Sequence, residues 1–369
     1  DSYNVAVGFE AGIAVTTGTA NTLIGGLAGD ALTDSDSNVA IGYSSLTADT
    51  LGKRSVAVGD GTLQQQNFTT ATSTYNVAVG YSAGNQVTTG NNNTLLGGQA
   101  GVALTDADFN VAVGSGALAA DTKGSTSVAV GVSALASQNH TTSTNSLNTA
   151  VGHSAGSSVT TGVANTFLGT QAGIYVTSNP YNIHIGYLAG SHAVTSTGQG
   201  NIIIGAFSST TSSGSDFANV IGYNVQGSGG YTTLGKVGDD IRALHGNVTW
   251  ATVSDERYKK DIADSTLGLS FINALKPRTF KYKNKGDLPT TFQSYEKDSS
   301  EVFKNTQTNH GFIAQEVKTA MDADSGVADG FRLWDERDDG SQEVAEAALI
   351  PVLVKAIQEL TARVAALES

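Results

Sequence analysis

The sequence has 369 residues, with 44 glycines, four prolines, 7% aromatic residues and no cysteine. This length favours two domains, and the glycine-rich composition indicates a repetitive β architecture more than an ordinary enzyme core. A net charge of −13 argues against binding to nucleic acid or anionic lipid, because both would repel the chain. No apolar run is long enough to suggest a membrane span, and without cysteine there are no disulfides or thiolate metal sites.

The charged residues divide the chain into two parts. Residues 1–253 hold only 5 of the 20 Lys and Arg and 13 of the 33 Asp and Glu, although they make up most of the chain. We therefore expect a repetitive β-roll shaft at 1–235, a connector at 236–253 and a second domain at 254–369. Because the chain opens at Asp1, we also expect it to be a fragment of something longer.

The first part is built from a repeat. The string NVAVG and its variants recur from Gly8 to Gly222 in steps of about 17 residues with occasional longer ones, and four steps make a superrepeat of about 72 residues. Two β-branched residues flank one alanine, which predicts a short strand with the valines in a narrow core and the alanine facing outward. The following glycine permits the positive φ or close approach that the turn requires. The predicted fold is mainly β, a parallel solenoid stabilised by stacking of its turns and by lateral association.

These repeats resemble the β-roll heads of trimeric autotransporter adhesins, most closely at NVAIG, residues 38–42. The resemblance implies a trimer of left-handed parallel β-rolls. The repeat spacing is longer here than in that family.

The second part resembles the endosialidase-type intramolecular chaperone, a self-cleaving serine peptidase domain at the end of phage tail spikes and fibres. Four blocks carry this resemblance in order: SDERYKKDI (254–262), LKPRTFKY (275–282), HGFIAQEV (310–317) and LIPVLVKAIQEL (349–360). Together they span nearly all of residues 254–369. The resemblance implies a smaller α+β domain that templates assembly and then removes itself.

Carried over to the matching positions, the resemblance makes Ser254 the nucleophile and Lys259 the general base. A lysine base must be neutral, which burial or a nearby cation would favour. The residues expected to support this dyad are Asp255, Arg257, His310, Gln315 and Glu316.

The resemblance points to cleavage between Ser254 and Asp255. Attack by the Ser254 hydroxyl on its own carbonyl would need a strained four-membered ring, whereas attack on the preceding carbonyl would need a five-membered one. A hydroxyl from a neighbouring chain avoids the strain, so cleavage between chains and cleavage within one chain both stay open.

An apolar stripe at 3-4 spacing ends the chain and predicts a short coiled coil. Pro351 indicates that its helix starts or kinks nearby. The alternative is a single amphipathic helix packed on its own domain. The stripe consists of Ile350, Leu353, Ile357, Leu360, Val364 and Leu367.

Other candidate sites are weaker. Asp34 with Asp36, and Asp106 with Asp108, occupy equivalent superrepeat positions and could contribute to a Ca²⁺ site, but two carboxylates do not complete a shell. Solvated turns explain them more simply, so we predict no metal and no cofactor.

The combined interpretation is a phage tail fibre or receptor-binding protein, in the virion tail after assembly in the host cytoplasm. Its expected partners are two further copies of itself in a homotrimer, a host-surface receptor with glycan among the candidates, and the rest of the tail through preceding sequence. The alternatives are a polysaccharide-degrading tailspike and a bacterial trimeric surface adhesin. Receptor binding is expected on the loops at 64–74, 136–146 and 206–218, because loops tolerate change.

Overall fold

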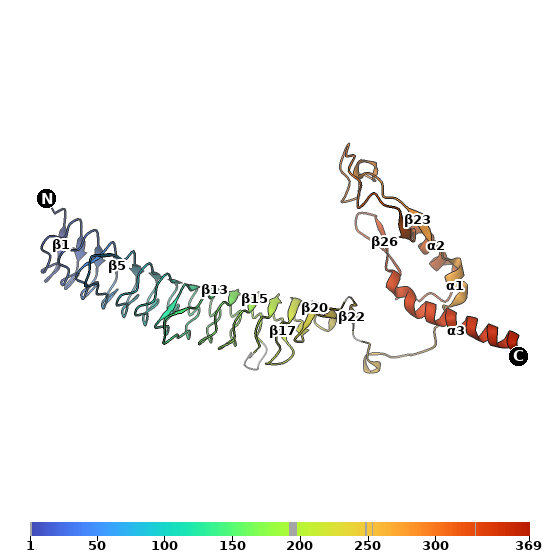
Figure 1. The fold of residues 1–369 in the computed structure, drawn as a ribbon, viewed down its shortest axis with the longest axis horizontal. Helices are drawn as coiled ribbons and strands as arrows, with labels where there is room; N and C mark the ends of the chain where they lie inside the picture. Colours follow the sequence, from blue (N-terminus) through green and yellow to red (C-terminus); the bar gives the residue numbers. More distant parts are fainter. Residues whose placement is uncertain (1, 192–197, 248, 253, 329) are drawn as a thin grey trace. The chain divides into compact units, whose positions relative to one another are not determined.

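The computed structural model describes residues 2–191, 198–247, 249–252, 254–328 and 330–369. The chain forms two compact units, residues 1–254 and 255–369. The first is a long column of stacked turns, and the second contains the helices (Figure 1). In the described ranges, no helix has the length and apolar character that crossing a bilayer requires.

The column is a parallel β-solenoid of about 13 turns. One long sheet runs along it, with one strand from each turn and further strands at its C-terminal end. In spatial order its strands are β1 (Val5–Val7), β2 (Thr22–Ile24), β3 (Val39–Ile41), β5 (Val56–Val58), β7 (Val77–Val79), β8 (Thr94–Leu96), β9 (Val111–Val113), β11 (Val128–Val130), β13 (Thr149–Val151), β14 (Thr166–Leu168), β15 (Ile183–Ile185), β16 (Ile202–Ile204), β18 (Asn219–Tyr223), β20 (Tyr231–Lys236), β21 (Asp239–Leu244) and β22 (Ala251–Thr252).

The register of this sheet confirms the predicted period. Val5 pairs with Thr22, and Thr22 pairs with Val39, so equivalent residues of successive turns lie side by side. The repeat glycine makes this stacking possible: Gly8 has φ +134°, and a Cβ on it would lie 2.4 Å from the carbonyl oxygen of Gly25. No other residue fits there, because both the backbone conformation and the space exclude a side chain.

The orientation of the strand side chains is opposite to our prediction. The middle alanines, such as Ala40 and Ala57, are fully buried, while the flanking valines point outward and are partly exposed. The interior has little room beside the strand, because leucines from the returning segments, such as Leu46 and Leu63, fill it. The strand therefore contributes its smallest side chain to the core. In other turns Leu23 or Leu95 takes the middle position.

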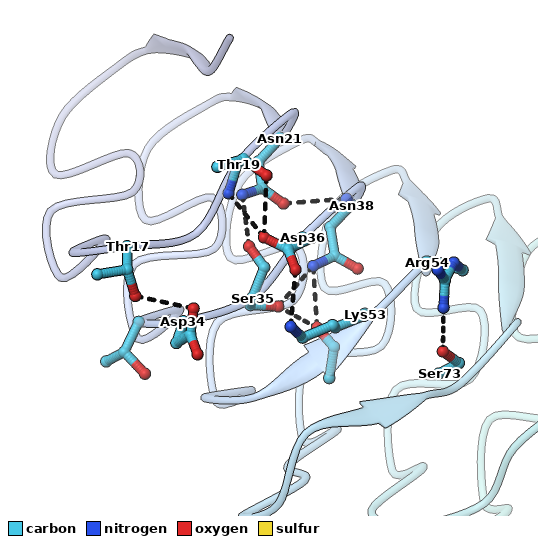
Figure 2. A network of polar contacts seen from close by, with 12 residues as sticks. Thr17, Thr19, Asn21, Asp34, Ser35, Asp36, Asn38, Lys53, Arg54 and Ser73 are labelled. Carbon is cyan, nitrogen blue, oxygen red and sulfur yellow. Dashed lines mark hydrogen bonds and ion pairs between the residues drawn. The ribbon is translucent and has the colours of Figure 1, made fainter. Parts of the chain in front are cut away.

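A column of asparagines joins the turns from inside. The N–H of Asn38 donates to Oδ1 of Asn21 at 3.0 Å (Figure 2). Oδ1 of Asn38 accepts from the N–H of Ser55 at 2.8 Å. Its Nδ2 donates to the carbonyl of Gly52 at 2.9 Å. The side chain thus satisfies buried backbone groups on two segments at once. The same arrangement recurs at Asn4, Asn21, Asn76, Asn93, Asn110, Asn148, Asn165, Asn182 and Asn201.

The asparagine column is interrupted once in each of the first two superrepeats, where serine replaces asparagine. At Ser55 a buried glutamine fills the gap: Gln66 Nε2 donates to Asp49 at 2.6 Å and to Ser55 at 2.8 Å, and its Oε1 accepts from Asn76 at 2.9 Å. The equivalent set follows one superrepeat later at Asp121, Ser127, Gln138 and Asn148.

Three pairs of two-residue strands accompany the long sheet at the longer loops. The first two pairs occupy equivalent positions in successive superrepeats, in agreement with the sequence. They are β4 (Gly52–Lys53) with β6 (Thr72–Ser73), β10 (Gly124–Ser125) with β12 (Thr144–Asn145), and β17 (Ser209–Thr210) with β19 (Gln226–Gly227).

Residues 236–253, where we expected a connector, include β21 and β22. β20 and β21 pair antiparallel, as do β21 and β22, so the direction of the sheet changes after its last parallel strand. This segment belongs to the first compact unit.

The second unit is smaller and mixed. Its core gathers Leu267, Phe271, Val317, Leu333 and Val352. Its elements are η1 (Glu256–Tyr258), α1 (Leu269–Ala274), β23 (Arg278–Phe280), η2 (Lys285–Asp287), β24 (Asn309–Gly311), α2 (Ala314–Ala323), β25 (Trp334–Glu336), β26 (Gln342–Val344), η3 (Glu346–Ala348) and α3 (Leu349–Glu368). β23 pairs with β24 and β25 with β26, both antiparallel.

The last helix has two apolar faces. Leu349, Val352 and Ala356 are buried in the core of the unit. The carboxylate of Glu359 accepts the N–H of Leu269 at 2.9 Å, at the start of α1. Pro351 lies in the first turn, as predicted for a helix start. The predicted stripe from Ile350 to Leu367 is exposed on the other face, so packing on its own domain does not account for it.

The asparagine column generates a first prediction. In Asn110→Ala the N–H of Ser127 and the carbonyl of Gly124 each lose a buried partner at 2.9 Å. We expect the free energy of unfolding to fall by about 2–6 kcal/mol, because each of the two unpaired buried groups costs about 1–3 kcal/mol. Urea denaturation followed by circular dichroism measures this loss. Asn145→Ala, at an exposed residue of β12, is the matched control, and an equal effect in both variants would contradict the assignment.

His184 occupies the core position of β15. Its ring contacts Phe167 with centroids 5.6 Å apart, and it pairs in register with Ile203 on the next turn. Neither ring nitrogen has a hydrogen-bond partner within the part of the chain that the structure describes. Burial lowers the pKa of His184 from 6.5 to about 4, since the charged ring would lose its hydration.

The solenoid should therefore lose stability in acid through this residue. Protonation favours the unfolded chain, so the loss begins below about pH 6.5 and amounts to roughly 2–3 kcal/mol by pH 4.5. In His184→Leu this component should vanish, because Leu23 and Leu95 occupy the equivalent position without charge. Urea midpoints at pH 7 and pH 4.5 measure it, with exposed His153→Leu as control. A wild-type pH dependence that survives in His184→Leu would refute this explanation.

Candidate functional site

The segment that starts the second domain is short, exposed and organised around one ion pair. Asp255 precedes η1, and its Oδ1 accepts the N–H of Arg257 at 2.9 Å. The Arg257 guanidinium returns to the same carboxylate through Nε at 3.0 Å and through its terminal nitrogen at 2.7 Å. These hydrogen bonds hold the pKa of Asp255 below its usual range, and the charge of Lys259 makes a smaller contribution in the same direction. The carboxylate thus fixes the turn that separates Ser254 from Lys259.

Ser254 and Lys259 flank this turn, and both are exposed. The N–H of Lys259 donates to the carbonyl of Glu256 at 2.9 Å and ends η1, after which the chain is extended. A lysine acts as a base only when it is neutral, and burial is one way to reach that state. Within its own unit Lys259 is exposed, and Arg257 is already paired with Asp255.

The boundary between the two compact units falls between Ser254 and Asp255, which is the bond that the resemblance predicts to be cut. The other carbonyl that we considered, that of Val253, lies outside the described residues.

A cavity of about 590 Å³ in the second unit is lined by one of the predicted residues, His310. Its walls include Arg278 and His310, which lie on the paired strands β23 and β24, and Glu346. Glu316 on α2 accepts from Arg278 at 2.9 and 2.6 Å, and this bidentate pair holds the pKa of Glu316 below its usual range. Gln315 is exposed beside it, and its backbone carbonyl accepts from Thr319.

The structure thus sorts the predicted residues into two groups. Asp255 and Arg257 lie beside the predicted dyad, whereas His310 lines the cavity and Glu316 pairs with Arg278 in the cavity wall. Arg278, which lines the cavity, was not among the residues that the sequence analysis predicted. It lies in the second of the four blocks, but its partner Glu316 is far along the chain, in the third block, and no local pattern connects them.

The paired aspartates of the solenoid stabilise its turns. Asp36 accepts from the N–H of Thr19 at 2.9 Å and pairs with Lys53 at 2.7 Å (Figure 2). Asp34 accepts from the hydroxyl of Thr17 at 2.8 Å, and Asp106 pairs with Lys123 at 3.5 Å. Over the described ranges, no three His, Asp or Glu side chains gather in a way that could hold a metal ion.

Comparison with known proteins supports the second domain directly. The model of the Peptidase_S74 family, described as the chaperone of endosialidase, matches residues 254–324. No curated protein and no solved structure matches the chain.

The match begins at Ser254, the first residue of the first block, and includes three of the four blocks. The chain therefore combines a β-solenoid with an endosialidase-type chaperone domain, an arrangement that fits a tail fibre. The match to this family suggests a self-cleaving peptidase.

Proposed function

We propose that the protein is the distal part of a phage tail fibre, a homotrimer whose C-terminal domain guides assembly and is then released by cutting the chain at Ser254. The observation that carries this proposal is the chaperone match starting at Ser254, directly where the solenoid unit ends. Its place is the virion tail, where the solenoid would bind a host-surface receptor and preceding sequence would join the rest of the tail.

Unpaired apolar surfaces on both units support self-association. Outward residues of the long sheet, such as Val7, Leu168 and Ile221, are between about two fifths and three fifths exposed. On α3 the stripe Ile350, Leu353, Ile357, Leu360, Val364 and Leu367 is exposed. A second copy of this chain, which has the same repeat along its length, can remove these surfaces from water.

The exposure of the dyad supports cleavage between neighbouring chains. In this mechanism the hydroxyl oxygen of Ser254 attacks the Ser254 carbonyl carbon of a neighbour, while Lys259 accepts the hydroxyl proton. The bond to Asp255 of that neighbour breaks, and its nitrogen leaves as an amine after receiving the proton. Water then hydrolyses the ester, which restores the hydroxyl and leaves a new carboxylate at Ser254. Assembly would supply the burial that a neutral Lys259 requires.

Intact mass measured under denaturing conditions tests the cleavage. We expect wild type to give two fragments that meet between Ser254 and Asp255, and Ser254→Ala to give one uncut chain. Lys259→Met should slow the cut by roughly 100-fold or more, as expected for loss of a general base. Lys260→Met is the matched control and should be cut normally. A single uncut species in wild type would leave the domain as a permanent assembly cap.

Mixed oligomers test whether the site is shared. Ser254→Ala chains and Lys259→Ala chains, each uncut alone, are unfolded together and refolded as a mixture. Cleavage should return if one chain supplies the hydroxyl and another the base. Continued absence of cleavage, with oligomers of normal mass by light scattering, would show that the hydroxyl and the base come from the same chain.

A further inference from the structure

One edge of the solenoid carries large exposed side chains at positions where the backbone is left-handed. The residue immediately before each core asparagine has positive φ, for example +52° at Tyr75, +59° at Phe109 and +63° at Tyr181. This conformation is uncommon for bulky residues. The backbone is held there by the stack: the N–H of Phe109 donates to the carbonyl of Asn91 at 3.1 Å, and that of Tyr181 to Val163 at 3.1 Å.

The large residues follow a rule along this edge. They occur on alternate turns, whereas the turns between them carry smaller or polar residues. Seven alternate turns carry this position. In all of them except the turn with Ser37, the residue at this position has a large side chain that is more than half exposed. We call this set the ring ladder: Tyr3, Tyr75, Phe109, Leu147, Tyr181 and Phe217. The intervening positions are Ala20, Arg54, Asn92, Thr126, Ala164 and Gly200.

The ring ladder does not serve the solenoid itself. Asn92 and Gly200 show that the same position accepts the residues for which a left-handed backbone costs least. The alternate turns carry Tyr, Phe or Leu instead, and those side chains are outside the core. Bulky residues that strain the backbone and bury little surface in their own chain indicate a binding surface.

The rings are fixed against the neighbouring turn. A Cβ on Gly200 would lie 2.7 Å from Cδ1 of Phe217, so this ring covers the glycine closely. The guanidinium of Arg54 lies 5.8 Å from the ring centre of Tyr75. Each of these rings therefore has one side on the protein, while more than half of its surface stays in contact with water.

Fixed carboxylates lie beside the ladder on some of the same alternate turns. Asp108 precedes Phe109, and its Oδ1 accepts the N–H of Asn91 at 2.8 Å. Asp216 precedes Phe217 and accepts the N–H of Gln199 at 2.8 Å in the same way. Asp36 before Ser37 repeats this bond to Thr19 (Figure 2). A flat apolar ring beside a rigid acceptor matches a sugar, which has an apolar C–H face and hydroxyl groups around its edge.

We propose that the ring ladder binds a neutral, linear polysaccharide with equatorial linkages, lying along the solenoid axis. Two turns advance about 10 Å, because neighbouring strands are roughly 4.8 Å apart. An extended chain of equatorially linked pyranoses presents the same face at every second sugar, at a similar interval. Stacked nucleic-acid bases would need cationic surroundings, which a chain of net charge −13 does not offer.

This inference names a ligand class for the proposed receptor-binding role and therefore rests on it, but it is tested separately from cleavage and assembly. The assembled wild-type protein is run in native gels containing glucomannan or hydroxyethyl cellulose, both neutral and β-1,4-linked. We expect retardation by at least one of them. Tyr75→Ala/Phe109→Ala/Tyr181→Ala should weaken binding by roughly tenfold or more, because it removes three stacking rings.

The matched control is Tyr43→Ala/Tyr81→Ala/Tyr187→Ala, which removes three tyrosines of similar exposure that follow the repeat glycine at the other end of the strand. Its binding should equal that of wild type. The proposal is overturned if wild type is retarded by neither polymer, or if both triple variants lose binding equally. It is also overturned if the ladder variant dissociates in light scattering, since the rings would then belong to contacts between chains. Normal cleavage at Ser254 together with absent glycan binding would reject this inference alone.

Discussion

The asparagine column is the interaction on which the first unit depends. A solenoid turn buries backbone groups that no regular helix or local hairpin satisfies, and an unpaired buried group is costly. Asparagine can satisfy these backbone groups because its short side chain has both an acceptor and two donors. Its oxygen takes the N–H of the next turn while its amide binds a carbonyl on a returning segment, as at Asn38. The column thus sets the vertical register that the narrow apolar core alone could not.

Much of the shaft could be predicted from the sequence, because repetition makes a weak local signal strong. The repeat period, the short strands and the need for glycine all follow from one short string. The prediction that the valines face the core was wrong. Alternation of residue types shows which residues share a face of the strand, but not which face lies inside. The answer depends on how much volume the returning leucines, such as Leu46, already occupy. That is a property of the closed turn and not of the strand.

In the second domain the sequence supports the family resemblance, whereas the catalytic roles of Ser254 and Lys259 stay a prediction. The block at 254–262 is local, so its turn and the nearby pair of Asp255 with Arg257 are within reach of pattern reasoning. The contact of Arg278 with Glu316 is not, because it depends on how β23 meets α2. Ser254 and Lys259, the predicted dyad, lie on an exposed segment. Under the proposed function, this exposure suits a peptidase that acts once, after its partners have come together.

The close contact between successive repeat glycines has a further consequence for how such a shaft can change its length. With no side chain between Gly8 and Gly25, the backbones meet directly, and each turn adds the same rise whatever its other residues are. Duplication of one superrepeat would insert four whole turns, roughly 19 Å, with the cross-section and both ends unaltered. Fibre reach can therefore evolve in discrete increments, independently of the surface chemistry that the outward residues present.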